Sequence, residues 1–488
     1  MVEQGGPSGE APQTTSPNLR EEVALLFEAG HRTLEPAALD QILRNAAPLE
    51  LSRALLDKFS ESILTEQTVS RFVREAFQTV SPEGYEKVAD GYRPHSRKVT
   101  PEQGYRELFT DRYQRLHRIL RGRPALKNLI SIRDVPRHRG EEFSVIGMVR
   151  EVRHTEKSHH LMLTLDDLTG ESSFLIGKDN PQSKGAFLHD EVLGLRVWLP
   201  KEGDLAYVKE VVHPGVPVPK EPHKTAFPSR VLFLSDLHVG SKMFLREEWH
   251  ELTAFLNGRT EQSTIAEQIR HVVVAGDLVD GIGIYPGQER DLAVLDILEQ
   301  YRELGRLLSE FPKRLNIVLI PGNHDAVCPA EPQPPLPEVF ARVLPSNVRL
   351  GGNPSLFSLD GVLIQAYHGR GFDNIVPNIP GARYEAPTEV MKHMLNMRHL
   401  SPSFGQKIPL APLPRDGLLI DPLPDIFVTG HTHTAGIERH KGVTLINASA
   451  WIAETEYQRM RNVKPEPAQA FLMDLAKSSA TQLDFSVR

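Results

Sequence analysis

Five short apolar runs in the second half of the chain each end in residue types that bind metal ions, and this pattern restricts the fold more than any other feature. The runs cover residues 231–234, 271–275, 316–320, 362–366 and 425–429. Aliphatic and β-branched runs of this length are typical of strands buried on both faces, as in parallel α/β sheets. The loops after such strands meet at the carboxyl edge of the sheet. We therefore expect the five polar clusters to converge on one crevice.

The polar clusters after these runs combine imidazole, carboxylate and carboxamide groups. They contain Asp236 and His238, Asp277 and Asp280, Asn323, His324 and Asp325, His368, and His431 and His433. Residues at i and i+2 of an extended segment point the same way, so the two side chains of each D-x-H or H-x-H pair can face the same crevice. A single pair is more often a hydrogen-bonded loop end, but five clusters in order at strand ends favour a metal site. A donor set without thiolate suits Mn²⁺, Fe or Zn²⁺ better than a Ca²⁺ cage.

Periodicity and composition divide the chain into six segments. They are a disordered tail (1–17), a helical module (18–80), a basic connector (81–124), an OB-type β-barrel (125–213), a Pro-rich linker (214–228) and an α/β domain (229–488). The tail is rich in Gly, Pro, Ser and Thr, and such a composition cannot bury enough apolar surface to order itself. The module repeats apolar residues at i, i+3 and i+4, whereas the barrel segment alternates over several short runs.

Charge is distributed unevenly along the chain. The net charge is −7, yet residues 91–140 hold thirteen Lys or Arg against four acidic residues. A solvated basic helix over residues 105–123 would explain this run. A surface that follows a phosphate backbone would explain it as well, with Arg112, Arg115 and Arg118 as candidate DNA contacts.

The scarcity of cysteine and of long apolar runs indicates the cellular setting. Its one cysteine, Cys328, excludes a disulfide scaffold and a cysteine-based zinc module and fits a reducing compartment. The longest apolar runs are shorter than a membrane span, and the first residues lack the apolar core of a signal peptide. We therefore expect a soluble intracellular protein that does not bind membranes.

The order D-x-H, GD, GNHD, H and GH-x-H between residues 230 and about 450 resembles the calcineurin-like metallophosphoesterases. The resemblance implies an α/β fold, a four-layer β-sandwich flanked by helices, and two divalent metal ions. Mn²⁺ is the first choice, with Fe, Zn²⁺ or Mg²⁺ as alternatives. It implies that Asp236, His238 and His433 hold the first ion, that Asn323, His368 and His431 hold the second, and that Asp277 bridges them.

The resemblance also implies roles beside the metals. His324 would stand next to the scissile phosphate and, as an imidazolium, protonate the leaving oxygen. Asp325 could orient that histidine. Two cations in one site lower the pKa of a bridging water and clamp the attacking and leaving oxygens of a displacement. Arg370 is a candidate phosphate contact and equally a candidate surface residue.

Longer strings narrow the substrate class. Gly281 stands where Ser/Thr phosphatases of the superfamily usually carry Arg, which disfavours a monoester substrate. The strings at 276–289, 391–405 and 411–433 are similar to those of the small subunits of archaeal family D DNA polymerases. This resemblance implies a 3'-5' proofreading exonuclease that acts on DNA primer ends as part of a DNA-directed DNA polymerase.

The same resemblance implies partners and alternatives. The expected partners are a large catalytic polymerase subunit, primer-template DNA and, through the holoenzyme, a sliding clamp, with a cytoplasmic, nucleoid-associated location. The OB-type barrel could bind single-stranded DNA or the large subunit. A DNA-repair nuclease of the same superfamily would instead cut DNA without a polymerase partner. A non-catalytic assembly subunit is the third hypothesis, and the complete ligand set speaks against it.

Overall fold

A computed structural model describes most of the chain. The described residues are 17–43, 48–59, 62–69, 84–155, 159–216, 220–454, 459 and 464–486. Apart from Pro17, the predicted tail of residues 1–17 lies outside this part, and so does the end of the helical module, residues 70–80. Within the described ranges, no helix is both long enough and apolar enough to cross a membrane.

Within the described residues, the N-terminal module consists of helices and a two-stranded sheet. They are α1 (Pro17–Ala29), β1 (Thr33–Leu34), α2 (Pro36–Leu43), α3 (Pro48–Lys58) and β2 (Ile63–Leu64), with β1 and β2 parallel. Proline fits the first turn of a helix because its missing N–H has no intrahelical partner there. The apolar positions of the helical repeat, among them Val23, Phe27 and Leu55, form one small core. Within the described residues of this module, helices occur where the repeat predicts them.

A closed five-stranded barrel follows, in the order β4-β5-β6-β8-β7. Its elements are η2 (Ile132–Arg137), β4 (Glu142–His154), β5 (Leu161–Asp166), β6 (Glu171–Ile176), η3 (Pro181–Lys184), β7 (Val192–Trp198) and β8 (Ala206–Val212). Alternate residues of β4 serve two cores. Val145 and Val149 fill the barrel, whereas Ile146 and Met148 pack outside it against helix α5. The predicted small barrel is confirmed.

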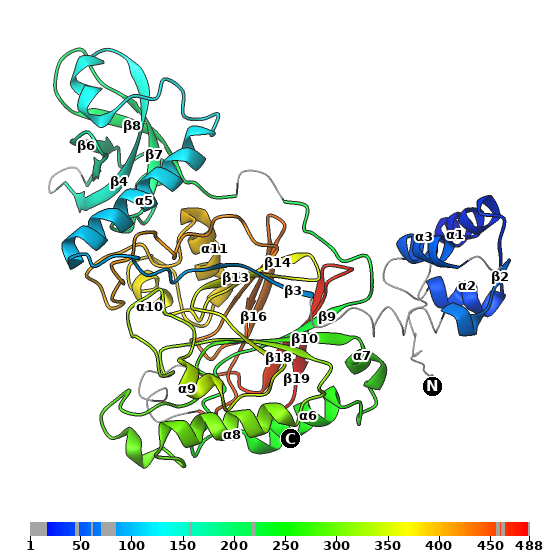
Figure 1. The fold of residues 1–488 in the computed structure, drawn as a ribbon. Coiled ribbons are helices and arrows are strands. Elements are labelled where there is room, and N and C mark those ends of the chain that lie inside the picture. The colour runs from blue at the N-terminus through cyan, green and yellow to red at the C-terminus, as the bar shows by residue number, and fades with distance from the viewer. Residues whose placement is uncertain are drawn as a thin grey trace, which may run out of the picture.

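Two six-stranded sheets make up the second half of the molecule (Figure 1). The first has the order β12-β11-β10-β9-β18-β19, with β9 (Arg230–Leu234), β10 (Ile269–Ala275), β11 (Asn316–Ile320), β12 (Val348–Leu350), β18 (Gln469–Asp474) and β19 (Ser479–Asp484). The second has the order β16-β17-β15-β14-β13-β3, with β3 (Tyr85–Asp90), β13 (Ser355–Leu359), β14 (Val362–Ala366), β15 (Ile426–Thr429), β16 (Gly436–His440) and β17 (Val443–Asn447). The five predicted runs coincide with β9, β10, β11, β14 and β15, which are divided between the two sheets. The mixed α/β class is confirmed.

One core lies between the sheets, and two further cores lie on their outer faces. The inner core includes Phe233 and Val273 from the first sheet and Ile364 and Val428 from the second. The outer face of the first sheet is covered by α6 (Arg246–Leu256), α7 (Ser263–Glu267) and α8 (Ile297–Ser309). The core of the second sheet's outer face includes residues of α10 (Phe372–Ile375) and α11 (Pro387–Met397). Two short helices, η4 (Gln288–Arg290) and α9 (Glu338–Ala341), lie in loops. Helix α8 joins the parallel strands β10 and β11, so this part of the chain is a β-α-β crossover.

The segment before the barrel is part of the folded body. Residues 85–90 form β3, which pairs antiparallel with β13 and so becomes the edge of the second sheet. Helix α5 (Pro101–Arg121) follows, and Thr100 caps it by accepting a hydrogen bond from Gln103 N. Its Leu116 and Leu120 pack against the outside of the barrel. The predicted basic connector (81–124) therefore contains an edge strand and a helix, and the helix is packed against the barrel rather than fully solvated.

Arg112, a predicted DNA contact on α5, is buried instead. Its Nε donates to Asp416 Oδ2 (2.5 Å), and its Nη1 donates to Pro402 O (2.6 Å) and Asp190 O (3.0 Å). A fully buried guanidinium cannot reach a phosphate, so the prediction for Arg112 is wrong. The residue ties α5 to the barrel and to the domain that holds the two sheets.

Arg115 is also bound within the protein. It donates to Asp416 O (3.1 Å) and to Asp421 Oδ2 (3.3 Å), and its side chain is only 12% exposed. The structure therefore contradicts its role as a DNA contact. The number of basic residues in a segment does not reveal which of them form ion pairs with acidic residues far along the chain. Arg118 on the same helix is exposed.

Candidate metal centre

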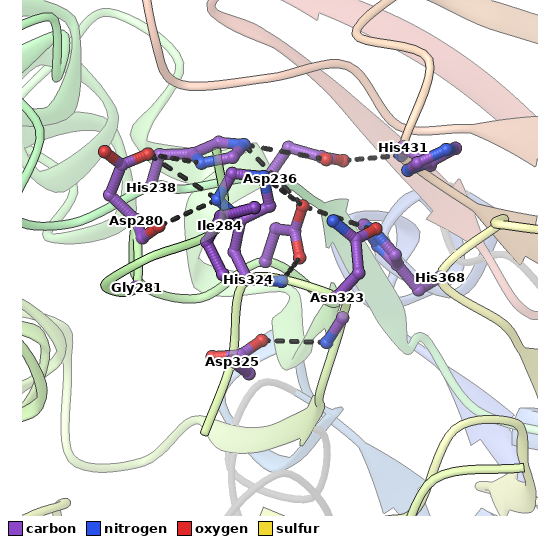
Figure 2. Close-up of polar contacts among 12 residues, drawn as sticks. Asp236, His238, Asp280, Gly281, Ile284, Asn323, His324, Asp325, His368 and His431 are labelled. Atoms are coloured by element: carbon purple, nitrogen blue, oxygen red, sulfur yellow. Dashed lines mark hydrogen bonds and ion pairs between the residues drawn. The ribbon is translucent and has the colours of Figure 1, made fainter. Parts of the chain in front are cut away.

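Loops from both sheets meet at the carboxyl ends of their strands, and their polar side chains point toward one another (Figure 2). The loops after β9, β10 and β11 come from the first sheet, and those after β14 and β15 come from the second. The predicted convergence occurs, because parallel strands within each sheet end on the same side. The crevice lies between two sheets rather than along one.

The first group of donors consists of Asp236, His238 and His433. One donor atom from each lies within 4.8 Å of the others. His433 Nε2 is 3.3 Å from Asp236 Oδ1 and 3.2 Å from His238 Nε2. Asp236 Oδ1 is buried and accepts no hydrogen bond from the described part of the chain. A buried carboxylate oxygen without a donor is in an environment that a cation would satisfy.

The second group consists of Asp277, His368 and His431, with Asn323 beside it. The donor atoms of the first three again lie within 4.8 Å of one another. His368 Nε2 is 3.3 Å from Asp277 Oδ2 and 3.1 Å from Asn323 Oδ1. Asp277 Oδ2 is also 3.8 Å from Nε2 of His238 in the first group. This carboxylate oxygen therefore lies between the two groups.

The spacing of these atoms suits a shared ion. Ligand atoms about 2.1 Å from one metal ion lie roughly 3.0–3.4 Å apart in tetrahedral or octahedral geometry. The pairs that join His433 to Asp236, His368 to Asp277 and His368 to Asn323 measure 3.3, 3.3 and 3.1 Å. The sequence-predicted ligands are thus together, at distances compatible with two cations.

Outer hydrogen bonds hold two of the imidazoles in position. Nδ1 of His238 lies 3.0 Å from Asp280 Oδ1, and Nδ1 of His368 lies 3.0 Å from Ala275 O. When Nδ1 carries the proton for such a bond, Nε2 keeps its lone pair for a metal. In both residues Nε2 is the atom that faces the other donors. Sequence reasoning noted Asp280 but assigned it no role.

Five of the ligand residues have left-handed backbone conformations. The φ angles of Asp236, His238, Asp277, His431 and His433 are +51°, +49°, +47°, +69° and +56°. Such conformations cost non-glycine residues about 1–3 kcal/mol each and persist where the surrounding structure demands them. Strain concentrated on the donors is consistent with a functional site.

Comparison with known proteins gives the family. A family model for the B subunits of DNA polymerases alpha and epsilon matches residues 231–437. The DNA polymerase II small subunit of Methanothermobacter thermautotrophicus is 41% identical over 371 residues, 74% of this chain and 75% of that protein. The corresponding protein of Thermoplasma acidophilum is 32% identical over 467 residues, 94% of this chain and 92% of that protein. The chain belongs to the family of archaeal DNA polymerase II small subunits. The resemblance to family D polymerase small subunits is confirmed.

A likeness among solved structures is much weaker. An archaeal phosphodiesterase aligns with 52% of the polymerase small subunit at 12% identity, with a TM-score of 0.28, and the alignment covers 98% of that structure.

Charges in the centre of the polymerase small subunit are tightly coupled. Burial alone would raise the pKa of Asp277, but His368, His324 and His238 lower it well below its usual range. Burial alone would lower the pKa of His368, but the carboxylates of Asp277 and Asp236 raise it to about 10. The imidazole of His368 and the carboxylate of Asp277 therefore stabilise each other's charged form. Binding of a cation requires the histidine to release its proton.

His324 lies at the edge of the centre, beside Asp277 and Asp280. Its backbone N donates to Asp277 Oδ1 (2.8 Å), and its Nδ1 lies 2.7 Å from Asp280 O. The other ring nitrogen, Nε2, is 3.9 Å from Asp277 Oδ2. The Asp280 carbonyl is thus the group that orients the ring, and Nε2 faces the metal ligands.

Asp325 does not orient His324. Its Oδ1 accepts from the Tyr301 hydroxyl (2.8 Å), and its Oδ2 accepts from Gly322 N (2.8 Å) and Leu278 N (3.1 Å). Burial raises the pKa of Asp325 most, the negative charge of Asp277 raises it further, and together they bring it to about 7. The predicted catalytic role is therefore corrected. The residue ties the loops after β10 and β11 to helix α8.

Arg370 and Asp373, which follow His368 in the sequence, lie near the second group. Nε2 of His431 lies 3.3 Å from Asp373 Oδ2. Burial would raise the pKa of Asp373, but His431 lowers it. Arg370 Nη1 donates to Pro329 O (2.8 Å) at the surface. Asp373 therefore contacts a candidate ligand of the second group.

Proposed function

We propose that this polymerase small subunit is a 3'-5' exonuclease that removes mispaired nucleotides from DNA primer ends in complex with a large catalytic subunit. The observation that carries the proposal is the position of Asp277 Oδ2, 3.3 Å from His368 Nε2 and 3.8 Å from His238 Nε2. One carboxylate oxygen between two donor groups is the arrangement that a two-metal hydrolase requires. The family supplies the polymerase context and hence the large subunit and DNA as partners.

The donor set fits two divalent ions. The first would be held by Asp236, His238 and His433, the second by Asn323, His368 and His431, and Asp277 would be shared. When bound, the ions supply Lewis acidity that activates water and balances charge on the phosphate in transit. Mixed imidazole, carboxylate and carboxamide donors favour Mn²⁺, with Fe, Zn²⁺ and Mg²⁺ as alternatives.

His324 supplies the proton for the leaving oxygen. With its Nδ1 hydrogen-bonded to the Asp280 carbonyl, the proton that can be transferred sits on Nε2, the atom that faces the ligands. The leaving group in DNA hydrolysis is the sugar oxygen of the shortened primer. Proton transfer to this oxygen from a positioned side chain contributes about 10²–10⁴-fold to the rate.

Two of the four predicted arginine contacts keep side chains that solvent can reach. Arg118 on α5 is exposed, and Arg370 is partly exposed beside the second ligand group. Both have positions from which a guanidinium can reach a phosphate, unlike Arg112 and Arg115. Such contacts position a strand without reading its sequence, as proofreading requires.

The test compares His324→Ala with wild type, each in complex with the large subunit, on a primer-template with a mispaired 3' end and Mn²⁺. We expect the rate of primer shortening to fall by about 10²–10⁴-fold, because the leaving oxygen loses its proton donor. Bound metal, measured by plasma mass spectrometry, should be unchanged, because His324 is not a ligand. His250→Ala, which truncates an exposed histidine on α6, is the control.

The outcomes separate the hypotheses. Absence of shortening by the wild-type complex would overturn the exonuclease proposal and favour an assembly role. Equal rates for wild type and His324→Ala would contradict the role of this histidine. Robust cutting by the small subunit alone, with no gain from the large subunit, would favour a repair nuclease.

A further inference from the structure

The loop after β10, residues 281–287, presents apolar side chains beside the metal centre. Ile282 and Ile284 are 48% and 38% exposed. The loop sequence, GIGIYPG, contains no charged residue, and the Tyr285 hydroxyl is bound to Asp291 (2.9 Å). Scattered apolar residues on a surface need no explanation. Ile282 and Ile284 differ from such residues because they lie beside the metal centre on a loop that is held rigidly.

Two buried glutamines hold the loop in one conformation. Gln288 accepts a hydrogen bond from Ile284 N (3.0 Å) and donates to Asp280 O (2.8 Å). Gln300 accepts from Gly281 N (2.9 Å) and donates to Gly281 O (3.1 Å). Both amides are therefore satisfied by the backbone of the loop, and a fully satisfied buried network rigidifies the segment it binds.

The loop is packed directly against His324. Asp280 O accepts from Gln288 and lies 2.7 Å from His324 Nδ1. A Cβ at Gly281, whose φ is +74°, would lie 2.2 Å from His324 O and 3.2 Å from Ile284 Cδ1. Figure 2 accordingly draws Ile284 beside His324. Only glycine allows this approach, which fixes an apolar side chain next to the proton donor.

We propose that Ile284, together with Ile282, contacts the base of the 3'-terminal nucleotide that is removed. This inference rests on the proposed exonuclease function and names a feature of its substrate. An uncharged rim offers nothing to a further phosphate, but it offers apolar surface to the face of a nucleobase. A mispaired terminal base leaves the stack at lower cost than a paired one, so this contact favours mispaired ends. Both isoleucines are positioning residues.

The test removes the contact first by truncating the two isoleucines and then by omitting the terminal base. The Ile282→Ala/Ile284→Ala variant, in complex with the large subunit, is compared with wild type on two primer-templates. One ends in a mispaired nucleotide, and the other ends in an abasic tetrahydrofuran residue at the same position. We expect kcat/KM to fall about tenfold on the base-bearing end, the effect of losing about two buried methylene groups. On the abasic end the variant and wild type should differ less than about twofold.

Controls separate this inference from structural damage and from the function itself. Val339→Ala truncates another exposed aliphatic side chain, 54% exposed on α9, and should match wild type on both substrates. Equal loss on both ends, with or without a loss of large-subunit binding, would overturn the base contact. Unchanged rates on both ends would overturn it as well. Absence of shortening by wild type would instead overturn the proposed function.

Discussion

An Asp277→Asn variant is expected to lose primer shortening by at least about 10³-fold and to lose metal from both donor groups. Removal of an outer-shell partner typically costs about 10–100-fold, and a shared ligand contributes more. Asparagine keeps the size of the side chain and the Oδ1 acceptor for His324 N (2.8 Å), so the loop should remain in place. It removes the charge at Oδ2, the atom between the two groups.

The measurement is metal content by plasma mass spectrometry together with the exonuclease rate. Asp280→Asn is the matched control, because this carboxylate contacts His238 Nδ1 (3.0 Å) rather than the space between the groups. It should reduce metal affinity about 10–100-fold without abolishing binding. Wild-type metal content and rate in Asp277→Asn would contradict the shared-ligand assignment.

The candidate ligands were predictable because the signals that mark them are local. Each lies within a few residues of the end of an apolar run, and the carboxyl ends of parallel strands meet whatever the lengths of their connections. The two-residue spacing of Asp236 and His238 needs no knowledge of the rest of the chain. Those two side chains therefore belong to one donor group in the structure, as expected.

Features that depend on distant partners were not predictable. Nothing near residues 85–90 indicates that they pair with β13, whose residues lie in the other half of the chain. Asp325 follows His324, and adjacency suggests a shared role, but its partner is Tyr301 on helix α8. A single sequence carries no periodic signal for such long-range pairs, because they depend on packing.

The basic segment illustrates the same limit with charge. A count over residues 91–140 predicts a positive surface, yet Arg112 within this segment forms a buried ion pair with Asp416. Burial would raise the pKa of Asp416, but Arg112 and His399 lower it, so the carboxylate stays charged in the core. His399 Nε2 lies 2.9 Å from the same oxygen, Oδ2. The pair is structural, and its disruption should affect stability.

Arg112→Met should therefore destabilise the folded protein by about 3–5 kcal/mol, the cost of leaving one partner of a buried ion pair uncompensated. Methionine keeps much of the side-chain length, so lost packing contributes little. The carbonyls of Asp190 and Pro402 would also lose their donor. At about 2–4 °C per kcal/mol for domains of this size, the melting temperature should fall by roughly 10 °C. Scanning calorimetry measures this shift.

Arg118→Met on the same helix is the matched control. Its side chain is exposed, and exposed substitutions usually change stability by less than about 0.5 kcal/mol. Equal melting temperatures for the two variants would contradict the structural role of Arg112. The two variants also separate the structural arginine of α5 from the candidate DNA contact. If this helix contacts DNA, the salt-dependent affinity of the protein for DNA should weaken in Arg118→Met. It should not weaken in Arg112→Met at temperatures where that variant is folded, because a guanidinium held by Asp416 cannot reach a phosphate.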